Sequence, residues 1–527
     1  MKLVTAAEMQ QFDKEAQEIY GISGLLLMEQ AARAVAEVAA AMVKPGESIV
    51  ILCGKGNNGG DGFGAGRYLL SYGHQVQVLL VGSLENITGD AAAELDMYIK
   101  AGGKVMEIKA AEDIVLAEVT CLKAGLIIDG LVGTGFKGAL EGIYKSLCAI
   151  ANSSRARRLA IDLPSGVNCN NGQVTAGAFK AEATVTMAMV KVGLLLEPAR
   201  SYCGRLYVAN LGTPAALGAQ VQGRQLITKE LVAGLMPVRP QDAHKGDAGR
   251  VTVCAGSPGF IGAAALCSEA AVKAGAGLVS LLTPMTSRDP LAIKLNEVMV
   301  HGLLERMPGI LGGGAAGDIV TRANQGQVLA IGPGLGTSEA TQDNICRVLE
   351  QVQVPVVIDA DAITALAGKE ELLTKMEAPK VLTPHVGEMA RLTGLTIEEI
   401  KENPLEIAVT YAKKYQAVIL LKGAPTIIAC PDGAVYFNTS GCNAMATGGC
   451  GDVLTGIIAS FIGQGLNVAQ AAVCGAYLHG LAGEIATKGE AGLAASQLAP
   501  LLPSLRQELR TKAAEEKVYN IGIKVIK

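Results

Sequence analysis

The sequence predicts an α/β protein of two domains, each with a parallel sheet covered by helices on both faces. Three observations support this fold class. The 527 residues exceed what one hydrophobic core usually serves. Short apolar runs that end in glycine alternate with helical patterns along the chain. The 65 glycines and only 4% aromatic residues favour packed α/β layers with tight loops over an aromatic-rich β-sandwich.

The sequence patterns over residues 24–189 predict the first domain. An alanine-rich helical pattern leads into residues 48–53, an apolar run that ends in glycine as a buried parallel strand does. The expected elements are a helix over 24–43, a strand over 48–53, a helix over 64–72 and strands over 75–81, 125–129, 158–163 and 183–189. Sheets of this kind bind ligands beyond the carboxyl ends of their strands, so the polar residues there form the candidate site.

Residues 211–245, which contain several glycines and prolines, are predicted as a connector, and a second α/β series begins at Gly249. Its expected elements are strands over 250–255, 277–283, 327–331, 354–359, 379–383 and 416–421, and helices over 261–274, 338–351, 452–463 and 468–486. The motifs of the first half do not recur in the second half. We therefore expect two different domains, over residues 1–215 and 216–510.

Composition narrows the possible functions. The net charge of −4 argues against nucleic acid as the main partner, because phosphate backbones require a basic surface. No apolar run reaches the length of a membrane span and the N-terminus shows no leader pattern, so we expect no membrane partner and a cytoplasmic location. The twelve cysteines include no Cys-x-x-Cys pair, which predicts buried thiols and no cysteine–histidine metal site.

A glycine-rich turn follows the first strand. Asn57-Asn58-Gly59-Gly60-Asp61-Gly62 is neither a P-loop nor the plain Gly-x-Gly-x-x-Gly dinucleotide fingerprint. It still offers backbone amides and two side-chain amides to an anion or a hydrated cation. Asn58, Asp129 and Ser165 supply oxygen ligands only, as a monovalent cation such as K⁺ requires.

This half resembles the NAD(P)H-hydrate epimerase family over about residues 1–215. The matching stretches are Asn57-Asn58-Gly59-Gly60-Asp61-Gly62, Ile128-Asp129-Gly130-Leu131-Val132-Gly133-Thr134-Gly135 and Asp162-Leu163-Pro164-Ser165-Gly166. The resemblance implies a Rossmann-like three-layer domain that holds K⁺ on Asn58, Asp129 and Ser165. It further implies substrate binding by Asn57, Asn58, Gly59, Gly60 and Asp61, nucleotide phosphate on Gly133, Thr134, Gly135, Phe136, Lys137 and Gly138, and acid–base work by Asp162 with Lys137.

The epimerase interpretation depends on the acid–base pair of Asp162 and Lys137. A carboxylate and an ammonium group beside one carbon move protons in both directions, as the interconversion of two epimers requires. The alternative for Asp162 is a turn residue before Leu163-Pro164. The alternative for Lys137 is an exposed lysine, and Lys191, at a strand end, competes for the cationic role.

The most informative stretch of the second half is Thr447-Gly448-Gly449-Cys450-Gly451-Asp452, a glycine turn that opens an apolar helix. Free N–H groups at a helix start hold anionic oxygens, and glycine allows their close approach. An aspartate there takes a proton from a hydroxyl while a phosphoryl group arrives. Three further motifs follow strands: Gly332-Pro333-Gly334-Leu335-Gly336, Thr383-Pro384-His385-Val386-Gly387-Glu388 and Leu421-Lys422-Gly423-Ala424-Pro425-Thr426.

Together with Lys245-Gly246-Asp247-Ala248-Gly249-Arg250, these motifs resemble the ribokinase-like superfamily over about residues 225–510, and most of all its NAD(P)H-hydrate dehydratase branch. Where that family has Ser-Gly-Asn-Pro, this chain has Ser440-Gly441-Cys442-Asn443. The resemblance implies a ribokinase-like α/β domain in which Asp452 is the base toward a substrate hydroxyl. The other implied contacts are Ala263, Gly334 and His385 to the nicotinamide substrate, and Lys422, Gly423, Ala424, Pro425, Thr426 and Gly451 to the nucleotide. Glu388 would organise Mg²⁺ through water.

Four of these residues also have a purely structural alternative. His385 would simply cap a helix, and Glu388 would complete a capping box at the same helix. Lys422 would be a solvated strand end, and Asp452 would be an N-cap residue.

Together the two resemblances imply repair of NADHX and NADPHX, the hydrated forms of NADH and NADPH. The N-terminal domain would interconvert the R and S hydrates, and the C-terminal domain would dehydrate the S form with ADP, or ATP as the variant, and release AMP and phosphate from ADP. The resemblance also implies a homo-oligomer. One rival hypothesis is a vitamin kinase acting on a hydroxymethylpyrimidine, thiazole or pyridoxal-type alcohol. The other is an N-terminal domain that binds a nucleotide or an RNA end without catalysis.

Overall fold

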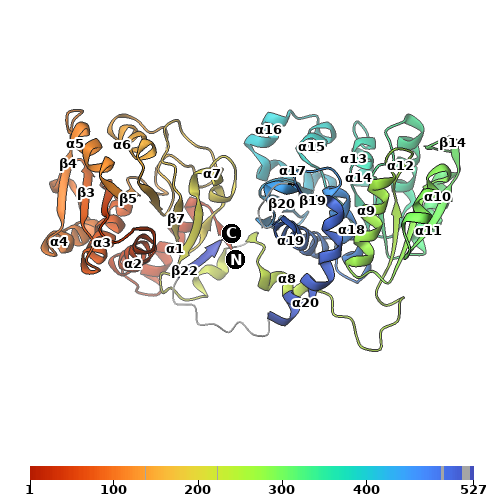
Figure 1. Cartoon of the computed structure of the whole chain (residues 1–527), viewed down its shortest axis with the longest axis horizontal. Helices are drawn as coiled ribbons and strands as arrows, with labels where there is room; N and C mark the ends of the chain where they lie inside the picture. The colour runs from red at the N-terminus through yellow and green to blue at the C-terminus, as the bar shows by residue number, and fades with distance from the viewer. Residues whose placement is uncertain (137, 222, 488–491, 513–522, 527) are drawn as a thin grey trace. The chain divides into compact units, whose positions relative to one another are not determined.

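The computed structural model describes residues 1–136, 138–221, 223–487, 492–512 and 523–526. The chain divides into two compact units (Figure 1). The described residues of the first unit are 1–136, 138–221 and 523–526, and those of the second are 223–487 and 492–512. Lys137, one of the expected acid–base residues, lies outside the described residues. Within the described part, none of the helices has both the length and the apolar character needed to cross a membrane.

An eight-stranded sheet forms the centre of the first unit, in the order β22-β9-β7-β6-β5-β2-β3-β4. Neighbouring strands are parallel except for β22, which runs antiparallel to β9 at one edge. The strands are β2 (Ser48–Cys53), β3 (Val76–Val81), β4 (Lys104–Ile108), β5 (Ala124–Gly130), β6 (Arg157–Ile161), β7 (Ala183–Met187), β9 (Arg205–Ala209) and β22 (Ile523–Ile526), with β1 (Leu3–Val4) paired to β8 (Val190–Lys191) outside this sheet. The register sets Asp129, near the end of β5, opposite Leu52 of β2 and Ala160 of β6.

Helices cover both faces of this sheet, and two separate cores result. Ile49 and Ile51 of β2 belong to the core under α1, α2, α3 and α4, whereas Val50 and Leu52 belong to the core under α5 and α6. The helices are α1 (Ala6–Glu18), α2 (Gly24–Met42), α3 (Asn57–Ser71), α4 (Gly89–Lys100), α5 (Asp113–Leu122), α6 (Gly142–Ser153) and the short α7 (Arg200–Cys203). The alternation of side chains along β2 thus produces the three-layer α/β arrangement that was predicted.

Helix α3 begins at the glycine-rich turn itself, so the expected start at Gly64 is wrong. A Cβ on Gly60 would lie 2.6 Å from Met28 Sδ, and one on Gly64 would lie 2.7 Å from the Cβ of Ala32. Glycine lowers intrinsic helix stability. The close packing of α3 on α2 requires these glycines, and packing outweighs helix propensity at this position.

The second unit contains a ten-stranded sheet in the order β10-β21-β20-β19-β18-β17-β16-β11-β12-β13. Only β20 runs antiparallel to its two neighbours, β19 and β21. The strands are β10 (Arg224–Leu226), β11 (Arg250–Cys254), β12 (Leu278–Pro284), β13 (Val298–Leu303), β16 (Val328–Ile331), β17 (Val356–Ile358), β18 (Lys380–Leu382), β19 (Val418–Leu421), β20 (Thr426–Ala429) and β21 (Val435–Asn438), and β14 (Glu305–Met307) pairs with β15 (Ile310–Leu311) apart from this sheet.

One large core packs α8, α9, α18, α19 and α20 against strands of this sheet, while α11 and α17 also contact its strands. The helices are α8 (Lys229–Leu235), α9 (Ile261–Lys273), α10 (Met285–Lys294), α11 (Ala315–Asn324), α12 (Glu339–Gln351), α13 (Asp361–Ala365), α14 (Glu371–Lys375), α15 (Val386–Thr393), α16 (Ile397–Glu402), α17 (Pro404–Tyr415), α18 (Cys450–Gly463), α19 (Val468–Thr487) and α20 (Leu502–Lys512). Figure 1 shows α9, α18 and α19 close together beside the sheet. A mostly parallel sheet with packed helices agrees with the predicted α/β class.

Several elements were not predicted from the sequence. The expected connector over 211–245 contains β10 and α8, and strands β4, β9, β13, β20 and β21 were not expected. β4 and β13 lie at sheet edges, and their partly exposed residues interrupt the apolar runs by which buried strands are recognised. Helix α18 begins at Cys450 rather than Asp452, because Gly449, at φ +93°, is its N-cap.

Candidate active sites

A cavity of about 580 Å³ lies at the carboxyl ends of β2, β5 and β6 in the first unit. The expected site residues that line it are Asn57, Asn58, Asp61, Gly133, Thr134, Gly135, Phe136 and Asp162. Gly138 instead lines a second cavity of about 520 Å³, which shares Gly133 to Phe136 with the first. Gly59 and Gly60, expected at the substrate, are buried in α3 and line neither cavity. A Cβ on Gly59 would lie 2.0 Å from the Gly54 carbonyl oxygen, so packing of the chain explains that glycine.

Asp162 forms a buried ion pair with Lys191 at the wall of this cavity. Lys191 Nζ lies 2.5 Å from Asp162 Oδ1 and also donates to Thr186 Oγ1 and to the Met187 carbonyl, at 3.1 and 3.0 Å. The Lys191 side chain is 0% exposed and that of Asp162 is 12% exposed. Asp162 has φ +65°, a left-handed conformation that non-glycine residues adopt at a cost. The cation that contacts Asp162 in the described part of the chain is therefore Lys191, the competitor named from the sequence.

The three expected K⁺ ligands lie close together, because Asn58 and Ser165 are both hydrogen-bonded to Val132 and Ser165 is also hydrogen-bonded to Asp129. Asp129 is fully buried and accepts hydrogen bonds from the Ser165 N–H and Oγ, both at 2.7 Å, and from the Leu131 N–H at 3.1 Å. Asn58 donates through Nδ2 to the Val132 carbonyl at 3.1 Å, which leaves its side-chain oxygen without a hydrogen-bond donor among the described residues. Burial raises the pKa of Asp129 to about 6, against these hydrogen bonds. A buried carboxylate without a cationic partner in the described structure fits a site for a monovalent cation.

Two other carboxyl groups in the cavity lining have raised pKa values. Burial raises the pKa of Asp13, on α1, to about 6, with Lys191 opposing the shift. Burial also raises the pKa of Asp61 far above its usual range, and the neighbouring Asp162 adds to the shift. Asp13 was missed from the sequence because an acidic residue on an amphipathic helix has no motif around it.

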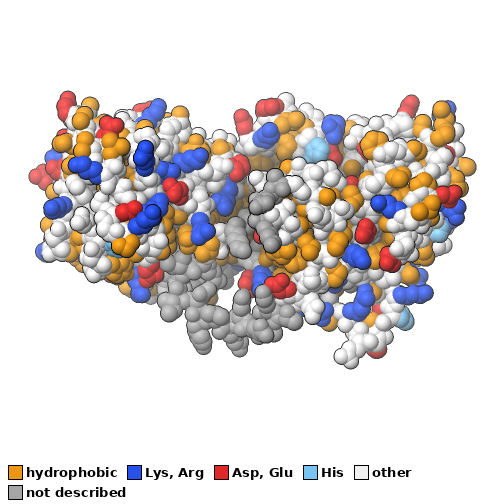
Figure 2. Space-filling model, in the orientation of Figure 1, with side chains coloured by type: hydrophobic (Ala, Val, Ile, Leu, Met, Phe, Trp, Pro, Cys, Tyr) orange, Lys and Arg blue, Asp and Glu red, His pale blue; other side chains and the backbone are white. Residues whose placement is uncertain are grey.

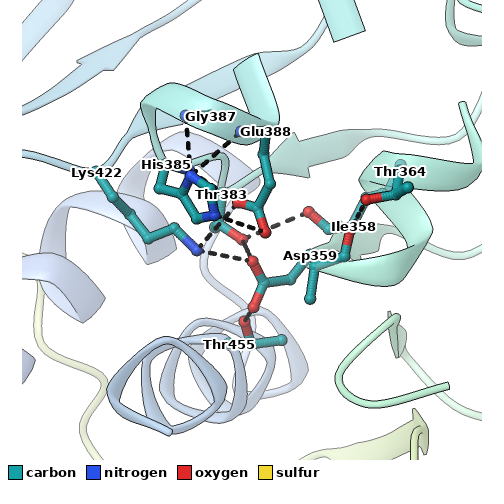
Figure 3. A network of polar contacts seen from close by, with 10 residues as sticks. Ile358, Asp359, Thr364, Thr383, His385, Gly387, Glu388, Lys422 and Thr455 are labelled. Carbon is teal, nitrogen blue, oxygen red and sulfur yellow. Dashed lines mark hydrogen bonds and ion pairs between the residues drawn. The ribbon is translucent and has the colours of Figure 1, made fainter. Parts of the chain in front are cut away.

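A polar network joins the strand ends of the second unit (Figure 3). At its centre is Asp359, directly after β17, which accepts hydrogen bonds from Thr455 Oγ1 on α18 and Thr383 Oγ1, both at 2.7 Å. Lys422 Nζ lies 3.1 Å from Asp359 Oδ1 and 3.5 Å from Glu388 Oε2. Burial disfavours the Lys422 ammonium, but Asp359 and Glu388 outweigh it and raise its pKa.

Lys422 therefore forms ion pairs with Asp359 and Glu388 and is largely buried. The alternative that it is a solvated lysine at a strand end is wrong. The network joins two of the four predicted motifs to α18. Asp359 was missed because Ile358-Asp359-Ala360 carries no glycine turn, although its place at a strand end was the available signal.

His385 and Glu388 form a capping box at the start of α15, so the capping alternatives hold for both. His385 Nδ1 accepts from the N–H groups of Gly387 and Glu388 at 2.9 and 3.2 Å, and the His385 N–H donates to Glu388 at 2.8 Å. An Nδ1 that accepts leaves the ring proton on Nε2. Nε2 lies 3.5 Å from Glu388 Oε1, and the imidazole is 54% exposed, so capping leaves it accessible to a ligand.

Asp452 is the third residue of α18 and not its N-cap, so that alternative is wrong. Burial raises its pKa to about 7, and Asp359, Asp361 and Glu388 add to the shift while Lys422 opposes it. A Cβ on Gly451 would lie 3.4 Å from Lys422 Nζ, which places the start of α18 directly beside the network. The second unit thus brings a carboxylate that titrates near neutral pH to a helix N-terminus.

The remaining expected contacts lie in two other loops and on α9 of this unit. Gly334 has φ +64°, and a Cβ there would lie 3.1 Å from the Cβ of Ala263, so these two residues are neighbours as expected. Residues 422–425 connect β19 to β20, and Thr426 Oγ1, at the start of β20, donates to the Gly423 carbonyl at 3.1 Å. The peptide between Ala424 and Pro425 in this turn is cis. Among the described residues, no three His, Cys, Asp or Glu side chains are grouped to hold a metal ion by themselves.

Two sheets, each with an acid–base group and glycine turns at its carboxyl edge, define an α/β enzyme with one site in each unit. Residues 24–193 match the family model of the YjeF-related protein N-terminus, and residues 251–504 match that of NAD(P)H-hydrate dehydratase. The chain is 44% identical to the bifunctional NAD(P)H-hydrate repair enzyme Nnr of Moorella thermoacetica, over 98% of this chain and 99% of that protein. It is 34% identical to that of Escherichia coli, over 94% of this chain and 92% of that protein.

The chain belongs to the family of bifunctional NAD(P)H-hydrate repair enzymes. Among solved structures, a ribokinase-like superfamily protein from Enterococcus faecalis is 30% identical, with a TM-score of 0.48 over 55% of this chain and 97% of that chain. An ADP/ATP-dependent NAD(P)H-hydrate dehydratase from Bacillus subtilis, co-crystallised with ATP and Mg²⁺, is 31% identical, with a TM-score of 0.47 over 54% of this chain and 98% of that chain. The full-length relatives favour the repair hypothesis over the vitamin-kinase alternative.

Proposed function

We propose that the first unit epimerises NADHX and NADPHX and that the second unit dehydrates the S epimers. The observation that carries the proposal is that each family-matched segment holds an acid–base group at the carboxyl edge of its sheet, the buried Asp162 in one and the partly buried Asp452 in the other. The full-length relatives are named as bifunctional NAD(P)H-hydrate repair enzymes.

In the first unit, the hydrated nicotinamide ring would lie in the cavity against Asp162 and Lys191. Asp162 would take the proton of the C6 hydroxyl while the bond from C6 to the ring nitrogen breaks and Lys191 protonates that nitrogen, which gives an open-chain aldehyde. Ring closure on either face of the aldehyde, with both protons returned so that Asp162 and Lys191 regain their original states, gives either configuration at C6. Gly133, Thr134 and Gly135 would bind the substrate phosphates through their backbone N–H groups. Asn58, Asp129 and Ser165 would hold K⁺. Its positive charge would balance the negative charge of the buried Asp129 carboxylate.

In the second unit, Asp452 would take the proton of the C6 hydroxyl while that oxygen bonds to the transferred phosphoryl group. The N–H groups at the start of α18 would stabilise the charge on the phosphoryl oxygens, at about 3–4 kcal/mol per well-placed donor. Phosphate then leaves with the C–O bonding electrons, and loss of a ring proton restores NADH or NADPH.

ADP would be the donor, with AMP as its product, held by Lys422 to Thr426 and Gly451. Mg²⁺ would bind the nucleotide phosphates and reach the acidic residues Asp359, Asp361 and Glu388 through its water ligands, because Mg²⁺ keeps several waters.

The test is incubation of the purified chain with an R and S mixture of NADHX, K⁺, Mg²⁺ and ADP, followed by NADH absorbance. Full recovery of NADH with release of AMP and free phosphate would support both activities. Recovery of the S fraction alone would contradict the epimerase assignment, and phosphate retained on the organic product would point to a kinase. Replacing ADP by ATP determines the donor.

Two further properties stay predictions. The homo-oligomer is testable by size-exclusion chromatography with light scattering. For the cytoplasmic location, all twelve cysteines are free thiols and eleven of them are buried, which fits a reducing compartment.

A further inference from the structure

A basic hollow of about 620 Å³ lies in the second unit, apart from the site at Asp452. It is lined by Arg239, Lys273, Arg506 and Arg510, together with Gly275, Pro503 and Gln507. None of these lining residues is acidic. The chain carries a net charge of −4, and Figure 2 shows Lys and Arg side chains mixed with Asp and Glu over the face it displays. Four cations around one hollow therefore depart from the general pattern of charge.

Two of these cations donate hydrogen bonds to backbone carbonyls at the C-terminal end of α9. Arg506 donates to the Ala274 carbonyl and, at 3.0 Å, to Gln464 Oε1, and its guanidinium lies 5.4 Å from the centre of the Phe461 ring. Arg239 donates to the Gly275 carbonyl at 2.5 Å. These bonds satisfy carbonyls that a helix leaves open at its C-terminal end, so both arginines have a structural role.

The other two cations have no such role. Neither Lys273 nor Arg510 has an ion pair or a side-chain hydrogen bond to another described residue. The crowding of charge acts on Arg506, whose pKa is lowered to about 10 by burial and then by Arg239 and Arg510. A helix C-terminus attracts cations with about half a negative charge, so the ends of α9 and α18 offset only about one of the four positive charges. The positive charge of the hollow thus exceeds the negative charge that the two helix ends supply.

We propose that this hollow binds a small phosphate-bearing anion of the size of a nucleotide or an inorganic polyphosphate. Guanidinium groups bind phosphate oxygens in pairs and a lysine adds a point charge, so the lining suits several phosphate groups at once. The volume lies within the usual range of small-molecule sites. Arg506 packs directly on Gly275 in the lining of the hollow, because a Cβ there would lie 2.1 Å from Arg506 Nη1.

This site is separate from the one at Asp452. Helix α18 carries Asp452 near its start and Phe461, under Arg506, near its end. At 1.5 Å per residue these two positions lie about 14 Å apart along the helix. None of the residues that line the hollow is among those proposed for catalysis.

The test compares binding of inorganic pyrophosphate to the full chain and to two double variants by isothermal titration calorimetry at low salt. Lys273→Gln with Arg510→Gln removes the two unused cations. Arg347→Gln with Lys401→Gln removes two exposed cations elsewhere in the same unit and is the matched control. We expect the parent and the control to bind one pyrophosphate more per chain than K273Q/R510Q does, or to bind it at least tenfold more tightly. The affinity of this additional site should fall as salt is added.

Equal binding by the parent and K273Q/R510Q would overturn the proposal and leave the cluster as helix capping alone. Equal losses in both double variants would reduce it to a general charge effect. A change in oligomeric state of K273Q/R510Q with unchanged pyrophosphate binding would identify the hollow as a contact between copies of the chain. Since Lys273 and Arg510 make no side-chain bonds to other described residues, the variant should fold, and its melting temperature checks this.

Discussion

At the scale of single residues, neighbours determine what each candidate group does. Asp452 is an aspartate at a helix start, where a low pKa would be usual, yet burial and three nearby carboxylates raise its pKa to about 7. A general base works best when its pKa lies near the working pH. The network around Asp359 therefore does more than hold the strands together, because its charge sets the proton affinity of Asp452.

The pH dependence of dehydration follows from that pKa. Asp452 accepts a proton only when ionised, so kcat should rise with pH through about 7. Asp361→Asn removes one of the negative neighbours, and the rising limb should move to lower pH. The measurement is kcat for S-NADHX against pH, with Asp242→Asn, an exposed carboxylate of the same unit, as control. A limb that stays in place or moves upward in D361N would contradict the argument.

Lys191 is the residue on which the epimerase depends most. Lys191→Met keeps the length of the buried side chain but removes the charge paired with Asp162, so epimerisation should fall between about 10²- and 10⁴-fold. Dehydration of pure S-NADHX should stay unchanged, and Lys123→Met, at an exposed position of the same unit, should leave both activities intact. R-to-S conversion followed by chromatography measures the effect. An active K191M would return the cationic role to Lys137.

At the scale of elements, the glycines of α3 show packing overriding propensity. Gly60 and Gly64 face α2, with gaps that admit no side chain, and the same helix start supplies Asn57, Asn58 and Asp61 to the cavity. The close approach of α3 to α2 therefore fixes the position of the cavity wall. In the second unit α18 has a comparable role, since its packed body holds the Gly449 turn against the network.

Gly64→Val tests this packing. Its Cβ would lie 2.7 Å from the Cβ of Ala32 and 2.9 Å from Glu94 Oε2, so α2, α3 and α4 must move apart. We expect the free energy of unfolding of the first unit to fall by about 1–3 kcal/mol, as measured by urea denaturation. Gly234→Ala, on α8 with no atom within 4 Å of the added Cβ, should not destabilise the protein. A G64V protein as stable as the parent would show that the interface has room.

At the scale of the whole molecule, each unit holds a complete set of candidate groups. The described residues that line the cavity at Asp162 belong to the first unit, and the described residues that form the network around Asp359 belong to the second. Two consecutive reactions on one chain suit this division, because a stereospecific dehydratase leaves the R epimer unused.

Complementation between inactive variants checks the division. Asp162→Ala should recover NADH from the S fraction only, apart from slow spontaneous epimerisation, and Asp452→Asn should recover none. An equimolar mixture of the two variants should recover NADH fully, as followed by absorbance with K⁺, Mg²⁺ and ADP. A mixture that stops at the S fraction would show that epimerisation and dehydration must occur within one chain.

Much of the fold was predictable because buried parallel strands and packed helices leave simple periodic patterns. The runs at β2, β5, β11 and β16 are apolar and end in glycine or a polar residue, and the structure confirms them. Edge strands such as β4 were missed because their residues are half exposed. β22 was missed because its pairing with β9 joins segments from the two ends of the chain, and no local pattern records that contact.

The sequence by itself determined the α/β class, the two domains' distinct motifs and the family. The reason is that glycine turns at strand ends are short local motifs, which can be recognised from the order of their residues. Asp162, Asp452, Asn58, Asp129 and Ser165 could be named for the same reason. Only the tertiary structure decided which groups meet: Lys191 with Asp162, Asp359 with Lys422, and the four cations of the basic hollow. Those pairings join residues from separate elements that only folding brings together, so no single stretch of the chain could predict them.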